Sequence, residues 1–180
     1  MNMRLMTFAT VLLLAIPRLL PAQQSEERTI GLASTFSADE VSWVLKPGNS
    51  TVTGQAFLRL KDGSLKSCTG FRIELLPAGE YASERIFKTY RNNEQGQVLL
   101  EDNPPKFTPD VRVYHDMLLK GGCNHRGEFR FEKVPAGEYY VMAFIIWEEN
   151  VGGVTRKTGG GVMKRIHVTP GSQLSVKLAN

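Results

Sequence analysis

Short runs in which apolar and polar side chains alternate recur along the chain after residue 51. They lie at 52–60, 71–76, 128–132, 162–168 and 174–178. A period of two is typical of strands with one face buried and the other in water. Turn-forming residues separate the runs, as in the Asp-Gly pair at 62–63, which supplies the positive φ that a tight turn needs. The pattern predicts an antiparallel β-sandwich.

The run Tyr139–Trp147 differs from the others because both of its faces are apolar. Tyr139, Val141 and every second residue to Trp147 fall on one face, while Tyr140, Met142, Phe144 and Ile146 fall on the other. Such a strand is expected at the centre of a sheet that is covered on both sides. Its nine residues are too few for a membrane-spanning helix.

The middle of the chain has a mixed pattern. Ala82–Tyr90 is predicted to be a short helix, because it has an apolar side and an i,i+4 pair of Glu84 and Lys88. Gln95–Phe107 contains two consecutive prolines and is expected to be a loop. Residues 108–120 fit a helix and a strand equally well, and the sequence leaves both open.

The first 22 residues have the features of a secretory signal peptide. A basic Arg4 precedes an apolar run over Leu5–Ile16, and the small Ala22 precedes a polar stretch. The run is shorter than a transmembrane helix needs, although an uncleaved N-terminal anchor is the alternative. Residues 23–50 are weakly patterned and are interpreted as an N-terminal arm, part of which docks on the body through Trp43.

Composition agrees with one exported globular domain. The chain has 180 residues, of which 42% are hydrophobic, and this is enough for a real core. The net charge is +4, and loss of the signal peptide removes Arg4 and Arg18. So mild a charge, without a clustered basic face, gives no support for a nucleic-acid binder. No membrane span is expected after signal cleavage.

Export changes how the two cysteines are interpreted. Outside the cytosol a disulfide can persist, and Cys68 and Cys123 are the only pair in the chain. We therefore expect them to be joined, with two separate buried thiols as the alternative. A metal site would need more ligands at shorter spacing, and a C-x-x-C redox motif is absent.

The segment from His125 to Tyr139 has a recognisable order of turn and strand residues. Gly127 permits a turn into a strand with alternating aromatics, and Pro135-Ala136-Gly137 then leads to the next strand at Tyr139, which we interpret as the closing turn of a hairpin. This run resembles the signature of the carboxypeptidase regulatory-like domains, which are prealbumin-like (transthyretin-like) sandwiches. The segments 52–76 and 166–178 also resemble the family's first two strands and its last strand pair.

The resemblance implies an all-β fold, a seven-stranded antiparallel prealbumin-like Greek-key sandwich with a helical or irregular insertion. It places the domain at residues 51–180 and the insertion at about 77–122. Members of the family are mostly non-catalytic accessory or surface modules, although prealbumin-like folds also host a few enzymes.

Candidate chemistry is sparse. His115 and His125, with Tyr114, are the best candidates for a metal-dependent enzyme, since some prealbumin-like dioxygenases bind iron through tyrosines and histidines. Surface histidines are the simpler explanation, and the same holds for His167. The chain lacks nucleophile-elbow, zinc-protease and phosphate-loop motifs. We therefore expect no catalytic residues, no metal and no cofactor.

Other charged and aromatic residues have two interpretations each. Asp102, Asp110 and Asp116 lack the spacing of a calcium loop and are expected to be solvated. Tyr81, Phe87 and Tyr90 are interpreted as filler of the insertion rather than an exposed patch. The candidate binding residues are Arg156, Lys157, Lys164 and Arg165, which would contact an anionic polysaccharide or an acidic partner; otherwise they form a solvated face.

Together these features predict an exported, non-catalytic β-sandwich module that is periplasmic or extracellular. It would bind an envelope protein or a polysaccharide through loops at one end and through the inserted segment. The alternatives are a metal-dependent enzyme that uses His115 and His125, and a structural subunit of an envelope assembly.

Overall fold

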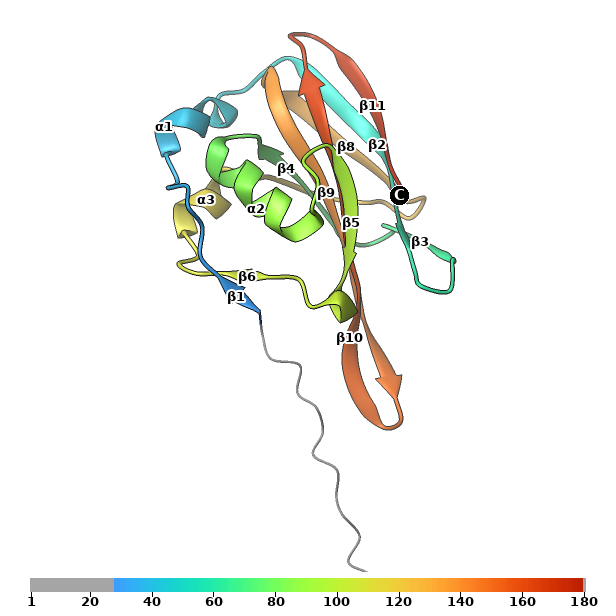
Figure 1. The fold of residues 1–180 in the computed structure, drawn as a ribbon. Helices are drawn as coiled ribbons and strands as arrows, with labels where there is room; N and C mark the ends of the chain where they lie inside the picture. Colours follow the sequence, from blue (N-terminus) through green and yellow to red (C-terminus); the bar gives the residue numbers. More distant parts are fainter. Residues whose placement is uncertain (1–27, 180) are drawn as a thin grey trace, which may run out of the picture.

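A computed structural model describes residues 28–179 of the chain (Figure 1). The predicted signal peptide, residues 1–22, lies outside the described residues, and its cleavage stays a prediction. The strands are β1 (Thr29–Ile30), β2 (Ser50–Arg59), β3 (Leu65–Ser67), β4 (Arg72–Pro77), β5 (Gln95–Leu99), β6 (Lys106–Phe107), β7 (Leu119–Gly122), β8 (Glu128–Val134), β9 (Gly137–Val151), β10 (Val154–Val168) and β11 (Gln173–Leu178). The helices are α1 (Ala38–Val41), α2 (Glu80–Tyr90) and α3 (Arg112–Asp116), with 3₁₀ helices at Ser42–Leu45 and Leu100–Asp102.

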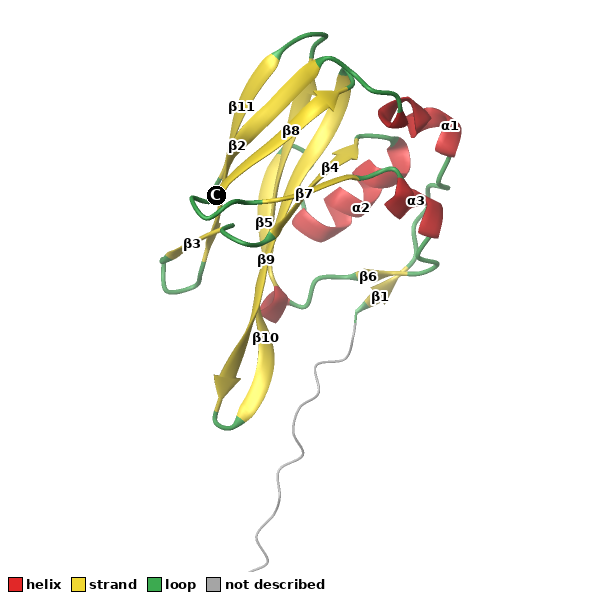
Figure 2. Ribbon diagram, turned by 180° about the vertical axis from the view of Figure 1, so that it is seen from behind, coloured by secondary structure: helices red, strands yellow, loops and turns green. Residues whose placement is uncertain are grey.

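Two sheets form the body of the molecule (Figure 2). The five-stranded sheet has the order β5-β10-β9-β4-β7, and all its neighbouring strands are antiparallel. In the four-stranded sheet, β2 pairs with β3 and β8 antiparallel and with β11 parallel. The all-β sandwich is confirmed, whereas the count of seven strands is not, because the two sheets of residues 28–179 contain nine.

Alternate side chains of both sheets fill the interior between them. Val52 and Leu58 of β2 and Ile73 and Leu75 of β4 are fully buried there, and Phe129 of β8 joins the same cluster. Each of these positions was expected to face inward from its period of two. Burial of such apolar surface supplies most of the free energy that opposes the chain entropy.

Strand β9 contributes to two cores at once. Its inward residues, such as Tyr139 and Val141, belong to the interior of the sandwich, while Tyr140 and Met142 are buried in a second cluster on the outer face. Helix α2 covers this outer face and adds Ile86 to the cluster (Figure 1). The prediction that 139–147 is central and covered on both sides is confirmed, although the strand is longer, at 15 residues.

The N-terminal arm packs against the body, as Trp43 suggested. The indole ring stands edge-on to Tyr139, with centroids 5.3 Å apart. It also lies where a Cβ of Gly137 would be, so only glycine fits at that position. Earlier in the arm, the backbone N–H groups of Ala33 and Ser34 and the Ser34 hydroxyl donate hydrogen bonds to the carboxylate of Glu84 on α2. Several contacts therefore hold the arm beside α2.

The insertion contains more regular structure than its sequence indicated. Ala82–Tyr90 is helical as predicted, within α2, and residues 108–120 contain both candidates, a helix at α3 and the start of strand β7. The prediction that Gln95–Phe107 is a loop is wrong at both ends of the segment. Residues 95–99 form β5, which pairs with 160–164 of β10, and 106–107 form β6, which pairs with β1. Backbone pairing with distant partners created these strands, and neither has the alternation that would reveal it.

Two further expectations about turns and strand limits need correction. Pro135-Ala136-Gly137 does not close a hairpin, because β8 pairs with β2 while β9 pairs with β4 and β10. The turn instead carries the chain from one sheet to the other. Strand β10 begins at Val154 rather than Val162 and includes the glycines at 159–161. Gly160 faces the Val98 carbonyl so closely that a Cβ would collide with it, so the glycine is what lets β5 pair there.

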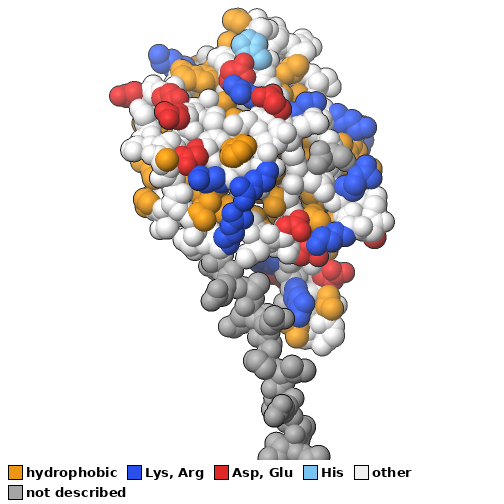
Figure 3. Space-filling view, viewed as in Figure 1, with side chains coloured by type: hydrophobic (Ala, Val, Ile, Leu, Met, Phe, Trp, Pro, Cys, Tyr) orange, Lys and Arg blue, Asp and Glu red, His pale blue; other side chains and the backbone are white. Residues whose placement is uncertain are grey.

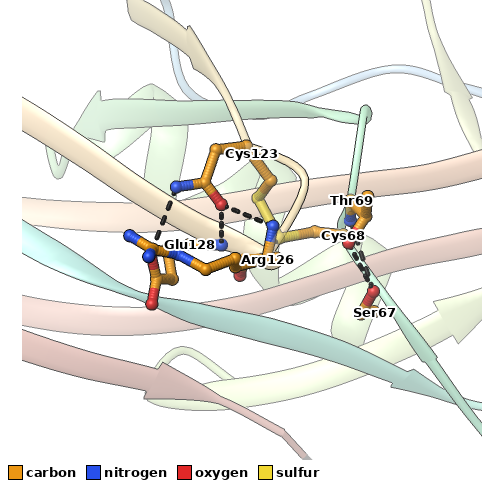
Figure 4. Close-up of a disulfide and its surroundings, with 8 residues drawn as sticks. Ser67, Cys68, Thr69, Cys123, Arg126 and Glu128 are labelled. Carbon is orange, nitrogen blue, oxygen red and sulfur yellow. Dashed lines mark hydrogen bonds and ion pairs between the residues drawn. A yellow bond between two sulfur atoms is a disulfide. The ribbon is translucent and has the colours of Figure 1, made fainter.

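A disulfide joins Cys68 and Cys123, as expected (Figure 4). Cys68 follows β3 of the four-stranded sheet, and Cys123 follows β7 at the edge of the five-stranded sheet. The bond therefore connects the two layers of the sandwich. Among the helices of residues 28–179, none has the length and apolar character needed to cross a membrane.

Candidate binding site

A groove of about 780 Å³ lies on the outer face of the five-stranded sheet, beside α2. Helix α2 forms one wall, the segment from Pro105 to Leu118 forms the other, and β4, β7 and β9 form the floor. We call it the α2 groove. Figure 3 views the face that carries α2, where Lys and Arg side chains lie beside hydrophobic ones.

The floor of the α2 groove is built from outward-facing residues of three adjacent strands. Arg72 and Glu74 of β4 point to the same face because successive strand residues alternate. Arg72 is paired in register with Phe144, and Glu74 lies between Met142 and Lys120. The Arg72 guanidinium lies over the Phe144 ring, 4.8 Å from its centroid, and its Nε binds Glu74 Oε1 at 3.1 Å. Glu74 is only 5% exposed, so a carboxylate is buried beneath the groove.

One wall is organised around Arg85. Its guanidinium lies over the rings of Phe107 and Tyr114, 4.4 Å and 4.6 Å from their centroids. Its Nη1 also donates a hydrogen bond to Asp110 Oδ1 at 2.8 Å, and His115 Nε2 lies 2.9 Å from the same oxygen. Aromatic rings and a carboxylate thus fix the plane and the direction of the guanidinium.

The titratable groups of the groove have shifted pKa values. Burial alone would raise the pKa of Asp110, but the hydrogen bonds from Arg85 and His115 outweigh it, so the pKa lies below its usual 3.8. Burial, together with the charge of Glu74, raises the pKa of Tyr90 above its usual value. Burial likewise raises the pKa of Tyr114. At neutral pH the groove therefore offers an ionised carboxylate and neutral phenols.

The sequence-predicted binding residues lie in two separate places. Arg156 and Lys157 line a second hollow of about 600 Å³ near Leu100 and Glu149, where β9 and β10 extend beyond the sheets. Lys164 and Arg165 lie eight residues, or about 26 Å, further along the strand. Arg165 is engaged by Glu138, at 3.2 Å, and by Glu94, at 3.5 Å. The structure does not bring the four together, and their contact with a ligand stays a prediction.

The histidines of the alternative enzyme hypothesis are also separated. His115 lies on α3 and lines the α2 groove, whereas Asn124 and Arg126, which flank His125, line a hollow of the four-stranded sheet. His115 is bound to Asp110, while Tyr114 is buried under Arg85. Within residues 28–179 no three metal-binding side chains of the His, Cys, Asp and Glu types converge.

The remaining candidates are divided between core and surface. Asp110 binds Arg85, and Asp102 pairs with the exposed Lys61 at 3.4 Å. Tyr81 is buried and fills the outer cluster, as interpreted from the sequence. Phe87 does not fill the core as the sequence had suggested, because its side chain is 50% exposed.

Sequence reasoning missed the α2 groove because its residues come from four distant segments. One signal was present: Arg72 and Glu74 are charged residues at outward positions, and they lie opposite the apolar Phe144 and Met142 of β9. A buried carboxylate needs a partner, so such a contrast marks a polar pocket within a covered face.

No protein-family model matches the sequence, and no curated protein matches it significantly. Among solved structures, the chain is similar to a Pseudomonas aeruginosa protein whose crystal structure is described as that of a "putative carbohydrate binding protein". The two share 21% sequence identity with a TM-score of 0.66, over 82% of this chain and 99% of that one. At this identity the likeness shows a common fold and leaves the ligand to be argued from the site.

Proposed function

We propose that this protein is an exported, non-catalytic β-sandwich module that binds a glycan of the cell envelope in the α2 groove. The observation that carries the proposal is the fixed guanidinium of Arg85, held against Phe107 and Tyr114 and bound to Asp110. A sugar presents apolar C–H faces and a ring of hydroxyl groups. It is bound well where rigid aromatic surface and oriented donors and acceptors line one concave site.

Three further points support the proposal. The structural relative with the same fold carries a carbohydrate-binding description, although this is a property of that protein. The α2 groove belongs in large part to the inserted segment, which the sequence had suggested for binding. The hollow on the bare face of the four-stranded sheet is of similar size, about 770 Å³, but its one aromatic lining residue, Phe129, is buried in the core.

Export to the periplasm or the exterior is part of the proposal. It is supported by the signal-like residues 1–22 and by the disulfide, which suits an oxidising compartment. We also propose membership of the carboxypeptidase regulatory-like family, on the strength of the 125–139 signature. The partner would then be an envelope polysaccharide or the glycan of an envelope protein.

The test is a binding screen of the protein without residues 1–22 against envelope glycans, followed by calorimetry. Phe107→Ala removes one ring from Arg85, and we expect it to weaken binding at least tenfold. Lys177→Gln, on the outer face of the other sheet, is the control and should bind as the unaltered protein does. Turnover of a bound glycan, or binding that Phe107→Ala does not change, would contradict the proposal.

A further inference from the structure

We infer that the glycan of the α2 groove is acidic and that Arg72 and Lys120 recognise its carboxylate. This inference rests on the proposed function and names the class of ligand for the same site. Four basic side chains line the groove, namely Arg72, Arg85, Lys106 and Lys120, against two carboxylates, Glu74 and Asp110. The lining is thus more positive than its own acidic groups can neutralise.

The two carboxylates are already engaged by protein groups. Asp110 is bound by Arg85, at 2.8 Å, and by His115, and Glu74 is bound by Arg72 at 3.1 Å. The Arg85 guanidinium is in turn held in the wall by protein contacts. The Phe107 ring lies against it, and the Tyr81 hydroxyl lies 3.3 Å from the same Nη1 atom. Of the other basic residues of the lining, Arg72 and Lys120 belong to the strands of the floor.

Arg72 has the capacity for a second carboxylate. Its contact with Glu74 runs through Nε, at 3.1 Å from Oε1, and its side chain is 61% exposed. Its contact with the Phe144 ring, 4.8 Å from Cζ to the centroid, places the guanidinium at the floor of the groove. A fixed guanidinium binds a planar carboxylate through parallel hydrogen bonds and distinguishes it from a neutral ester.

Lys120 lies next to Arg72 on the same face. It is opposite Glu74 in the β4–β7 register, and so occupies the diagonal position to Arg72. Diagonal neighbours on one sheet face are about 7–8 Å apart, within reach of two long side chains. Lys120 is exposed and makes no ion pair with the residues described in the structure. Together the two residues can contact one carboxylate from adjacent strands.

The experiment compares oligosaccharides of galacturonate, mannuronate and glucuronate with their methyl esters, which lack the negative charge and carry one added methyl group per residue. Calorimetry at 50 mM and 300 mM salt should show that one acid form binds at least tenfold more tightly than its ester, with a smaller ratio at high salt. Arg72→Gln and Lys120→Gln should each reduce that ratio to near one. Lys177→Gln makes the same charge change on the other sheet and should preserve it. Thermal unfolding of each variant checks that the fold is intact.

The outcomes separate this inference from the proposed function. Equal binding of acid and ester, or binding of neutral glycans alone, overturns the acidic ligand and leaves glycan binding in place. An acid preference that survives in both Arg72→Gln and Lys120→Gln overturns the assignment of these residues. If no glycan of the screen or of this series binds, both the inference and the proposed function fail.

Discussion

The outer faces of the two sheets differ although the inner faces are alike. In the five-stranded sheet, outward residues such as Tyr140, Met142 and Met163 are apolar, and α2 and the N-terminal arm cover them. In the four-stranded sheet, the outward residues Thr53 and Arg130 are polar, and they line an open hollow. The difference shows that a period-two pattern carries two kinds of information. Its inward residues indicate that the strand belongs to a sandwich, and its outward residues indicate whether another element covers the sheet.

The comparison also explains where a binding site can form. On the bare face, ion pairs such as Arg130–Glu132, at 2.8 Å, join side chains that are exposed to solvent. On the covered face, the insertion excludes water, so Glu74 is buried and Arg85 is held by rings. Electrostatic contacts are stronger in such surroundings. A covered face with a polar gap is therefore the better place to recognise a ligand.

We expect the largest loss of stability from a substitution in the interior that the two sheets share. Tyr139→Ala removes a ring with no exposed surface, its contact with Trp43 and the hydrogen bond from its hydroxyl to the Pro135 carbonyl. We expect a loss of about 3–5 kcal/mol in the free energy of unfolding. Urea denaturation measures it, and a loss below about 1 kcal/mol would contradict the role of Tyr139 in the core.

Removal of the disulfide should cause the next largest loss of stability, because the bond joins the two sheets. Cys68 and Cys123 are separated by 55 positions, and replacing both by serine frees that loop in the unfolded chain. The expected loss is about 2–4 kcal/mol. Mass spectrometry under non-reducing conditions provides the chemical check. Two free thiols in the protein isolated from its native cells would show that the bond does not form there.

A pair of matched variants tests the contrast between the outer faces. Ile86→Ala removes a buried side chain of α2 from the covered face, and we expect a loss of about 2 kcal/mol. Gln55→Ala, at an exposed position of the bare face, should change the free energy of unfolding by less than about 0.5 kcal/mol. Equal losses in the two variants would mean that α2 is not packed on the sheet.

We expect the smallest loss of stability when the contact between the N-terminal arm and α2 is weakened. Hydrogen bonds from the Ala33 backbone, the Ser34 hydroxyl and the Ser34 backbone lower the pKa of Glu84 from 4.5 to about 2. A lowered pKa stabilises the fold above pH 4.5, and the contribution disappears as the pH falls through 4.5 towards 2. Glu84→Gln should therefore be less stable than the unaltered chain at pH 7, and the difference should shrink below pH 4.5 and vanish below about pH 2. Thermal melts over this range measure the difference, and a constant gap would rule out the titration.

The sequence predicted what depends on local alternation. The strands around Val52, Ile73 and Phe129, the two-sided strand at 139–147, the helix at 82–90 and the docking of Trp43 are all present in the structure. Apolar side chains must be buried wherever the period repeats, so the pattern alone is informative. The only pair of cysteines in the chain likewise left one possible disulfide.

Elements that depend on distant partners could not be predicted in this way. Strand β5 forms because β10 offers a free edge beside Gly160, and β6 forms because β1 reaches it. The basic residues 156–165 looked like a cluster in sequence, yet an extended strand carries its ends far apart. The α2 groove needed the register of β4 with β7 and β9, which fixes Arg72, Lys120 and Phe144 on one face.

The pairing of β1 with β6 has a practical consequence for work on this protein. The Arg28 carbonyl accepts a hydrogen bond from the Lys106 backbone, and Phe107 follows at once as the ring beneath Arg85. An affinity tag fused directly before Arg28 would lie next to the wall of the groove and could alter the affinity that is being measured. Ligand studies are therefore better served by a carboxy-terminal tag, or by one that is removed before titration.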